Sequence, residues 1–418
     1  MARRGTPADP EGVFILLTEE HDAVIVGAGP AGLALSISLA QAGLRVAVVD
    51  TQSADALAAP PEDGREIALT HPSVALLQRL GVWAQLQPHE VGHIREARVV
   101  DGADSARPLR FDAADSGQAA LGAIVPNQAL RRASHAVAAQ WAQQIRLMPS
   151  TRATQVRVQP EQAEVQIDTP GAAGATLRGR LVVAADSRFS PTRRQLGVGA
   201  AMQDFGRTMI VCRMAHEAPH GEVAHECFGY DSTLALLPLP GGASSVVLTT
   251  DAAQAALLMA MPEDAFCARV QHQFGERLGA LQLRSPRHAY PLVGVYADRF
   301  AGHRFALAGD AAVGMHPVTA HGYNLGLQGV ASLTAVLQRA HAAGHDIGQA
   351  SVLAAYDRQH RRETALIYHG TNAVVRLFAN DSAPHRLLRR LVLGGARRLP
   401  PLQWAIRRQL TGAAAAVR

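Results

Sequence analysis

The sequence predicts an α/β protein with a parallel sheet, a separate antiparallel sheet and a helical C-terminal part. Two short, continuously apolar stretches flank a glycine-rich turn near the N-terminus, which is typical of buried parallel strands. Alternating patterns between turn signals fill the middle of the chain, and they favour antiparallel strands. The 418 residues, of which 48% are hydrophobic, are enough for two or three domains.

The first ordered elements form a βαβ unit. The run Asp22–Gly27 predicts a buried strand, and the apolar segment Pro30–Ala42 predicts a helix that Gly43 ends. Arg45–Asp50 predicts a second buried strand. Residues 1–20 show no clear period, and we expect them to be a disordered leader.

The turn within this unit reads Gly27-Ala-Gly29-Pro-Ala-Gly32, and Asp50 ends the second strand. Between a strand and a helix, this pattern predicts a Rossmann-like dinucleotide site. Gly27 allows the tight turn, Gly29 lets a pyrophosphate approach the helix N-terminus, and Gly32 permits close packing of helix and strand. Asp50 can accept hydrogen bonds from the adenosine ribose, which disfavours NADP but does not separate FAD from NAD.

The middle and C-terminal parts of the chain carry their own patterns. A helix is expected over Ile124–Val137, opened by Pro126-Asn127, and a buried strand over Leu181–Ala185. The antiparallel strands are expected over Thr208–Met214, Glu226–Tyr230, Thr233–Leu237 and Ser245–Thr250. The remaining elements are a helix over Pro262–Leu278, a buried strand over Phe305–Ala308 and a helix over Gly322–Arg339.

A second motif, Gly309-Asp310, directly follows a predicted buried strand. Asp310 should therefore lie at the edge where open α/β sheets bind ligands. The helix that begins at Gly322–Asn324 presents free N–H groups and partial positive charge. This helix start suits a group that gains negative charge, such as a flavin ring on reduction.

A third motif, Asp186-Ser187, follows the predicted strand at 181–185 and precedes a basic helix start. Taken in order, the three motifs resemble the aromatic-ring hydroxylase branch of the FAD-dependent monooxygenases. Within that branch, the segments 314–324 and 236–242 resemble the ubiquinone-biosynthesis hydroxylases, the UbiH/UbiM-like group. The resemblance covers residues 21–380 and implies an FAD-binding domain of the p-hydroxybenzoate hydroxylase type with an antiparallel substrate domain.

The resemblance implies which residues hold FAD. The glycine-rich turn and Asp50 would hold the ADP half, Asp310 the ribitol, and the helix start at 322–324 the flavin edge through backbone donors. Arg65 would lie near the flavin and its phosphates, and Asp186 would support the cofactor. The residues expected to bind the cofactor are Gly27, Gly29, Gly32, Asp50, Arg65, Gln128, Asp186, Gly309, Asp310, Gly322, Tyr323 and Asn324.

Two residues are expected to act in catalysis. The resemblance places Pro317 beside the flavin ring on the substrate side. His321 stands where the family usually has Gln. It either accepts the phenol proton of a substrate, since imidazole titrates near neutrality, or only hydrogen-bonds the loop beside the flavin.

Two other positions depart from the family pattern. Ser187 replaces the usual Gly, which leaves the nicotinamide-side role of Asp186 open. Gln128 stands where an arginine is frequent, and Arg131 or Arg132 can substitute for it.

The resemblance implies the reaction as well as the cofactor. NADH or NADPH would reduce bound FAD, and O2 would form a flavin C4a-hydroperoxide that hydroxylates a prenylated phenol or quinol of ubiquinone biosynthesis. A single nucleotide fingerprint means that the reductant binds only transiently. Excluding water requires an apolar pocket. Its candidate walls, unless they are ordinary sheet core, are Phe228, Tyr230, Leu234, Leu236 and Leu237.

Two alternative functions remain open at this point. One is a hydroxylase of a soluble aromatic acid or polyketide. The other is a non-catalytic FAD-binding subunit of a quinone-biosynthesis complex, which the departures at Ser187 and Gln128 would fit. A nicotinamide dehydrogenase would explain the first motif but not Gly309-Asp310.

The expected domains are discontinuous. The FAD-binding domain takes residues 21–85, 120–200 and 285–345, and the substrate domain takes 86–119 and 201–284. A helical, arginine-rich segment spans 346–418.

The net charge of +5 is concentrated at the C-terminus. All basic residues are arginine, and residues 384–418 carry arginines but no acid, so nucleic-acid binding by the main body is not expected. We expect this segment to contact an anionic membrane surface or a quinone-biosynthesis complex, or else to be a solvated helix. With no spanning stretch or secretory signal, the expected location is the cytoplasm or the periphery of the inner membrane. Scattered cysteines and histidines predict no metal site.

Overall fold

The computed structural model describes residues 20–101, 108–229, 232–316 and 322–379, together with Val392, Thr411 and Gly412. Several sequence predictions therefore fall outside the described residues. They are the leader up to residue 19, Tyr230, Pro317, His321 and most of the arginine-rich C-terminal segment.

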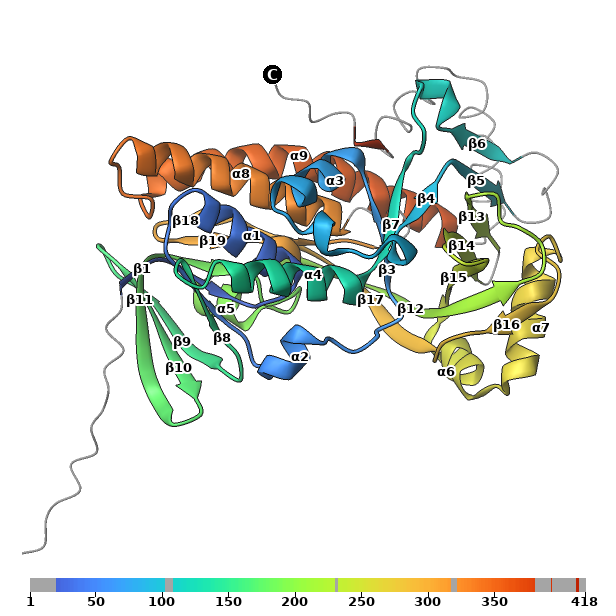
Figure 1. The fold of residues 1–418 in the computed structure, drawn as a ribbon, viewed down its shortest axis with the longest axis horizontal. Coiled ribbons are helices and arrows are strands. Elements are labelled where there is room, and N and C mark those ends of the chain that lie inside the picture. Colours follow the sequence, from blue (N-terminus) through green and yellow to red (C-terminus); the bar gives the residue numbers. More distant parts are fainter. Residues whose placement is uncertain are drawn as a thin grey trace, which may run out of the picture.

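A mostly parallel sheet forms one end of the molecule (Figure 1). Its path runs β18-β19-β11-β1-β2-β8, and β9 and β10 extend it from β11 as an antiparallel meander. β1 pairs in parallel with both β2 and β11, and both faces are covered where the paired segments 23–26, 46–49 and 181–184 are buried, so these segments are apolar throughout. The strands are β1 (Glu20–Val26), β2 (Val46–Val49), β8 (Ile145–Met148), β9 (Arg152–Val158), β10 (Ala163–Thr169), β11 (Ala172–Ala184), β18 (Ala301–Gly302) and β19 (Phe305–Leu307).

A second, larger sheet forms the other end. Its path runs β20-β17-β12-β15-β14-β13-β5-β6, with β16 paired to β12, and every pairing is antiparallel except that of β13 with β5. Its strands are β5 (Glu96–Asp101), β6 (Leu109–Asp112), β12 (Ala200–His216), β13 (Val223–Phe228), β14 (Thr233–Leu239), β15 (Ala243–Asp251), β16 (Leu281–Leu283), β17 (His288–Ala297) and β20 (Val313–Gly314). A small antiparallel sheet contains β3 (Glu66–Leu69), β7 (Gly122–Pro126) and β4 (Gly92–Ile94).

The helices cover the two large sheets. Figure 1 shows α8 and α9 side by side along the molecule, while α6 and α7 lie at the end formed by the second sheet. The helices are α1 (Pro30–Gln41), α2 (Ala54–Ala58), α3 (His71–Arg79), α4 (Asn127–Gln140), α5 (Pro191–Gln195), α6 (Ala252–Ala260), α7 (Glu263–Phe274), α8 (Gly322–Ala342) and α9 (Ala350–Ala379). Among the residues described, no helix is both long enough and apolar enough to cross a membrane.

Several predicted boundaries were wrong. Ile124 and Val125 lie in strand β7, and helix α4 begins only after Pro126, whose extended conformation separates the two elements. α7 ends at Phe274 because Gly275 takes the left-handed conformation, with φ 75°. β12 is much longer than predicted and continues through an irregularity between Asp204 and Thr208.

The two faces of the second sheet serve different purposes. On one face, alternate strand residues such as Ile210 and Leu248 pack with α6 and α7 in a closed core. On the other face, the intervening residues, such as Met209 and Val247, line a cavity. The period-2 alternation of the strands therefore divides the sheet into a structural face and a face turned to the site.

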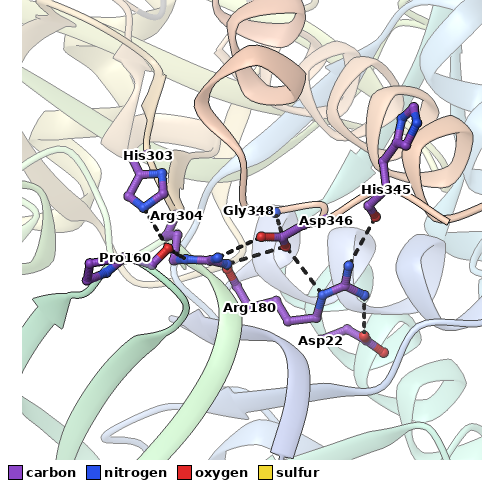
Figure 2. A network of polar contacts seen from close by, with 8 residues as sticks. All are labelled: Asp22, Pro160, Arg180, His303, Arg304, His345, Asp346 and Gly348. Atoms are coloured by element: carbon purple, nitrogen blue, oxygen red, sulfur yellow. Dashed lines mark hydrogen bonds and ion pairs between the residues drawn. The ribbon is translucent and has the colours of Figure 1, made fainter.

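A charged network joins the α8–α9 connection to the parallel sheet (Figure 2). Asp346 lies between two arginines, 2.6 Å from the Arg304 guanidinium and 3.4 Å from that of Arg180. Arg304 is buried and also donates to the Pro160 carbonyl at 2.8 Å, and Arg180 reaches Asp22 on β1 at 3.3 Å. The network fixes the start of α9 relative to the central strands.

Candidate functional site

A cavity of about 780 Å³ lies between the carboxyl ends of the parallel strands and the open face of the second sheet. Its volume is in the range of cofactor and small-molecule sites. The parallel-sheet end is lined by the loop at 29–31, by Ser187 and Arg188, and by Gly309 and Asp310. The other end is lined by residues of β12, β13, β14, β15 and β17.

The three glycines of the first motif have different surroundings. A Cβ atom on Gly27, whose φ is +112°, would lie 2.4 Å from the Ala185 carbonyl oxygen, and one on Gly32 would lie 2.0 Å from the Gly27 carbonyl oxygen. A Cβ on Gly29 would meet no protein atom within 4 Å, and Gly29 lines the cavity. Two glycines thus allow close packing, and the third leaves room for a ligand such as the FAD pyrophosphate.

The N-terminus of α1 lines this space, and Asp50 is hydrogen-bonded to the glycine loop. Pro30 opens the helix, and no side chain caps its N-terminus. Asp50 accepts hydrogen bonds from the backbone N–H groups of Ala28 at 2.7 Å and Gln52 at 2.8 Å. A carboxylate has acceptor capacity beyond these two bonds, so the residues present fit a nucleotide with a ribose hydroxyl at Asp50.

The Gly309-Asp310 motif meets the third motif across the cavity. Asp310 accepts a hydrogen bond from the Arg188 guanidinium at 2.9 Å, and Arg188 also donates to the Val293 carbonyl at 3.0 Å. A Cβ on Gly309 would lie 2.9 Å from the Cβ of Ala31, so glycine keeps the two cofactor loops close together. Arg188 was not predicted as a site residue, although it directly follows the Asp186-Ser187 turn.

Asp186 has a structural role in the geometry observed. Its carboxylate accepts from the Ser190 hydroxyl and from the Thr192 N–H at 3.0 Å, and so it holds the start of α5. Ser187 has φ +80°, in the left-handed region that favours glycine, and it lines the cavity. This backbone conformation explains why a turn of this kind usually contains Gly.

Arg65 lies at the cavity wall in a small cluster around Asp63. Its guanidinium is 2.5 Å from the Asp63 carboxylate, which also accepts from the Asn127 amide at 2.6 Å. The guanidinium lies over the ring of Tyr290, 5.5 Å from the ring centre. Burial raises the pKa of Asp63, but the hydrogen bond and charge of Arg65 outweigh it and hold the pKa below its usual value.

Gln128 is not among the residues that line the cavity. It lines a small separate hollow beside Asp63, whereas Arg131 lies at the cavity wall and donates to the Gln52 side chain at 2.5 Å. Arg132 instead pairs with Glu90 at 2.7 Å. Of the two substitutes considered from the sequence, Arg131 is therefore the one placed to meet a ligand.

The start of α8 is held in place by a side chain of its own. Asn324 accepts a hydrogen bond from the Thr70 N–H at 2.9 Å and donates to the Ala68 carbonyl at 2.8 Å. Gly322 and Tyr323 line the cavity, and the Tyr323 hydroxyl is buried without a hydrogen-bond partner among the described residues. Burial raises the pKa of Tyr323, which keeps the hydroxyl protonated and able to donate.

The sheet end of the cavity is largely apolar. Of the walls predicted from the sequence, Phe228 and Leu237 line it, whereas Leu234 and Leu236 belong to the core beneath α6 and α7. His316 also lines it, with burial lowering its pKa to about 4, so the ring is neutral at pH 7.

Two acidic side chains that the sequence analysis did not single out reach this cavity. The side chain of Glu66 is fully buried and pairs with Arg213 at 2.8 Å; burial raises its pKa to about 7 despite the opposing charge of Arg213. Glu226 lies on β13 among apolar neighbours, and burial raises its pKa to about 8. No residue pattern in the sequence marks either one, because strand alternation predicts which side a residue takes but not what lies opposite.

Comparison with known proteins gives consistent matches. The family model described as "FAD binding domain" matches residues 20–367. The chain is 42% identical to ubiquinone hydroxylase UbiM of Neisseria meningitidis, over 96% of this chain and 86% of that protein. It is 37% identical to ubiquinone hydroxylase UbiL of Rhodospirillum rubrum, over 94% and 89%. In fold it is similar to the p-nitrophenol 4-monooxygenase PnpA of Pseudomonas putida, with a TM-score of 0.76, 18% identity and coverage of 94% and 99%.

Proposed function

Because this chain belongs to the FAD binding domain family and to its ubiquinone hydroxylase group, we propose that it hydroxylates the aromatic ring of a prenylated phenol or quinol in ubiquinone biosynthesis. The resemblance read from the three motifs is confirmed, and so are the predicted fold class and FAD as cofactor. The chain is an FAD-dependent aromatic-ring monooxygenase that acts on a small aromatic molecule.

One observation carries the proposal: a single cavity contains both a nucleotide cradle and an apolar sheet face. The glycine loop, Asp310 and the start of α8 lie at one end, and Met209, Phe228 and other apolar side chains lie at the other. A ligand in the apolar end would lie next to a flavin held by residues 309–310 and 322–323. This juxtaposition is what ring hydroxylation requires, since the aromatic substrate must meet the flavin away from water.

We assign the following work to the protein. When bound, FAD supplies the redox chemistry that activates O2 for transfer of one oxygen atom to the ring. The α1 N-terminus and Asp50 bind the adenosine part, and the start of α8, fixed by Asn324, orients the flavin edge. The apolar residues of the second sheet exclude water from the reacting ring.

The reductant and the oxidant belong to the proposal as well. The chain has one nucleotide fingerprint, at 27–32, and this supports NADH or NADPH binding only transiently. O2 would enter as co-substrate. Pro317 and His321 remain candidates for the substrate side of the flavin, with His321 as a proton acceptor for the substrate phenol.

The proposed substrate is lipid-soluble, and we propose that residues 384–418 bring the enzyme to it. This segment interleaves arginines with leucines and carries no acid, which suits the surface of an anionic membrane. Sedimentation with vesicles tests it: the full chain should bind anionic but not neutral lipid, and replacing Arg389, Arg390, Arg397 and Arg398 by Gln should release it. If wild type and the variant sediment equally with anionic vesicles, these arginines do not bind the membrane, and binding to a quinone-biosynthesis complex becomes the better explanation of the segment.

Product analysis tests the function. The FAD-loaded protein is given NADH or NADPH with either a short-chain prenylphenol or 4-hydroxybenzoate, and nicotinamide oxidation and ring products are measured. Stimulation by the prenylphenol, with one oxygen added to the ring, is the expected result. Stimulation by the soluble acid alone would move the function to the sister hydroxylases, and bound FAD with no stimulation by either would favour a non-catalytic subunit.

A further inference from the structure

Glu226 has an unusual place in the cavity. Among the described residues of the second sheet that line it, Glu226 is the only acid. Its strand neighbours in register are Val99 on β5 and Ala235 on β14, and the row continues to Val247 and Val211. Residues directly opposite each other project from the same face, so the carboxyl group lies in a strip of apolar side chains.

No cation of the described residues compensates this carboxyl group. Within the described residues, Glu226 makes no ion pair and no hydrogen bond. The arginines on the same face, Arg207 and Arg213, lie on β12, three strands away and hence about 14 Å across the sheet. Arg213 is engaged by Glu66 at 2.8 Å, and Arg98 on β5 pairs with Glu96 from the opposite face.

The surroundings of this carboxyl group therefore favour its uncharged form. Burial alone raises the pKa of Glu226 to about 8, and no interaction lowers it. A neutral carboxyl can both donate and accept one hydrogen bond. Left unpaired in an apolar wall, it destabilises the cavity, so a ligand oxygen that pairs with it is favoured there.

We propose that Glu226 binds the oxygen substituent of an uncharged aromatic substrate and thereby selects neutral phenols, quinols or quinones over aromatic carboxylates. The inference rests on the proposed function and narrows its substrate class. A carboxylate placed beside Glu226 would lose its hydration without a cation next to it among the described residues, since Arg207 lies three strands away, whereas a ring hydroxyl or carbonyl would exchange hydrogen bonds with Glu226. Glu226 thus sets which end of the substrate faces the sheet and which ring carbon faces the flavin.

Two substitutions separate hydrogen bonding from charge. Glu226→Gln keeps a donor and an acceptor of the same shape, and Glu226→Leu removes both. Glu263→Gln, at an exposed position on α7, is the matched control. The measurements are FAD content, thermal melting, the Kd of a neutral 4-alkylphenol and of 4-hydroxybenzoate, and the kcat and KM of hydroxylation.

The expected pattern is specific. All proteins keep their FAD, and Glu226→Leu melts at or above the wild-type temperature because a carboxyl group that no described residue pairs with is gone from the apolar wall. Glu226→Leu raises the Kd and KM for the alkylphenol about tenfold or more, while Glu226→Gln stays within about threefold of wild type. Wild type binds 4-hydroxybenzoate more weakly than the alkylphenol.

Three results would overturn the inference: unchanged alkylphenol binding in Glu226→Leu, equal losses in both variants, or tighter wild-type binding of 4-hydroxybenzoate. Equal losses of alkylphenol affinity in Glu226→Gln and Glu226→Leu would mean that the substrate is bound by the ionised carboxylate and not by the neutral acid. Failure of the proposed function would look different, because wild type would then form no oxygenated product from the alkylphenol whatever the variants do.

Discussion

Gly29 and Gly32 lie one helical turn apart, yet a side chain at each would meet different surroundings. At Gly32 a Cβ would collide with the Gly27 carbonyl oxygen, and at Gly29 it would enter the cavity. We predict that Gly32→Ala lowers the free energy of unfolding of the FAD-free protein by about 2 kcal/mol or more, and that its melting temperature falls accordingly. Gly29→Ala should melt as wild type but bind much less FAD.

Two measurements check these predictions for Gly29→Ala and Gly32→Ala: the flavin absorbance per protein molecule, and the melting temperature of each FAD-free protein. Wild-type FAD content in Gly29→Ala would contradict the placement of the pyrophosphate at that loop. The close packing at Gly27 and Gly32 was predictable from the sequence because it follows from backbone geometry alone, whereas the pyrophosphate at Gly29 stays a prediction.

Other residues of the site could not be predicted from the sequence, for physical reasons. Arg188 meets Asp310 only because two strand ends, separated by more than a hundred residues in sequence, adjoin in the sheet. Asp186 was expected to support the cofactor, but its carboxylate accepts hydrogen bonds from residues at the start of α5. A motif identifies residue types at a turn, but the direction of each side chain depends on the surrounding fold.

At the scale of elements, the start of α8 depends on a single side chain. Asn324 connects it to Ala68 of β3 and to Thr70, which lies between β3 and α3. We predict that Asn324→Leu loses about 1–3 kcal/mol of stability, because buried backbone groups lose their hydrogen bonds. FAD affinity should fall as well, since the helix start is no longer fixed.

Asn324→Asp provides the graded control. It keeps the acceptor for Thr70 but not the donor to Ala68, so its loss should be intermediate in denaturant unfolding. Wild-type FAD affinity in Asn324→Leu would mean that FAD binding does not depend on how the start of α8 is held.

The α8–α9 connection gives a prediction with a definite pH dependence. Burial raises the pKa of Asp346, but hydrogen bonding to Arg304 and its charge outweigh this and hold the pKa below its usual value. A lowered carboxyl pKa stabilises the folded state above the unfolded-state pKa, and this stability is lost as pH falls through the folded-state pKa. Asp346→Ala should therefore cost about 1–3 kcal/mol at pH 7, and the difference from wild type should shrink toward pH 3.

Thermal melting across this pH range, with the exposed Glu161→Ala as control, makes the measurement. A difference between wild type and Asp346→Ala that stays constant down to pH 3 would mean that the ion pairs in Figure 2 do not stabilise the fold.

Elements with strong local signals were predictable from the sequence, and those set by distant pairing were not. The βαβ unit and the strand before Asp310 appear where their apolar runs and glycines indicate. The parallel pairing of β13 with β5 was missed, because register between strands far apart in sequence has no local signature. Ile124 and Val125 suit a strand as β-branched residues, and Pro126 separates them from the helix.

At the scale of the whole molecule, the site exists only where the two large sheets meet. One sheet brings the cofactor loops together at its carboxyl edge, as open parallel sheets do. The other turns a largely apolar face toward that edge, and Glu226 is the one acid among its described cavity-lining residues. In the proposed account, specificity and cofactor binding therefore lie on separate layers, so we expect substitutions on the sheet face to change substrate choice and leave FAD content unchanged.

The measurement that tests the central claim most directly is incorporation of labelled oxygen. The FAD-loaded protein is supplied with NADH or NADPH, a neutral prenylphenol and ¹⁸O2 in ordinary water, and the product is analysed by mass. We predict a ring-hydroxylated product that carries one ¹⁸O atom, formed in step with nicotinamide oxidation. Nicotinamide oxidation that yields only hydrogen peroxide, or a product whose new oxygen comes from water, would contradict the account.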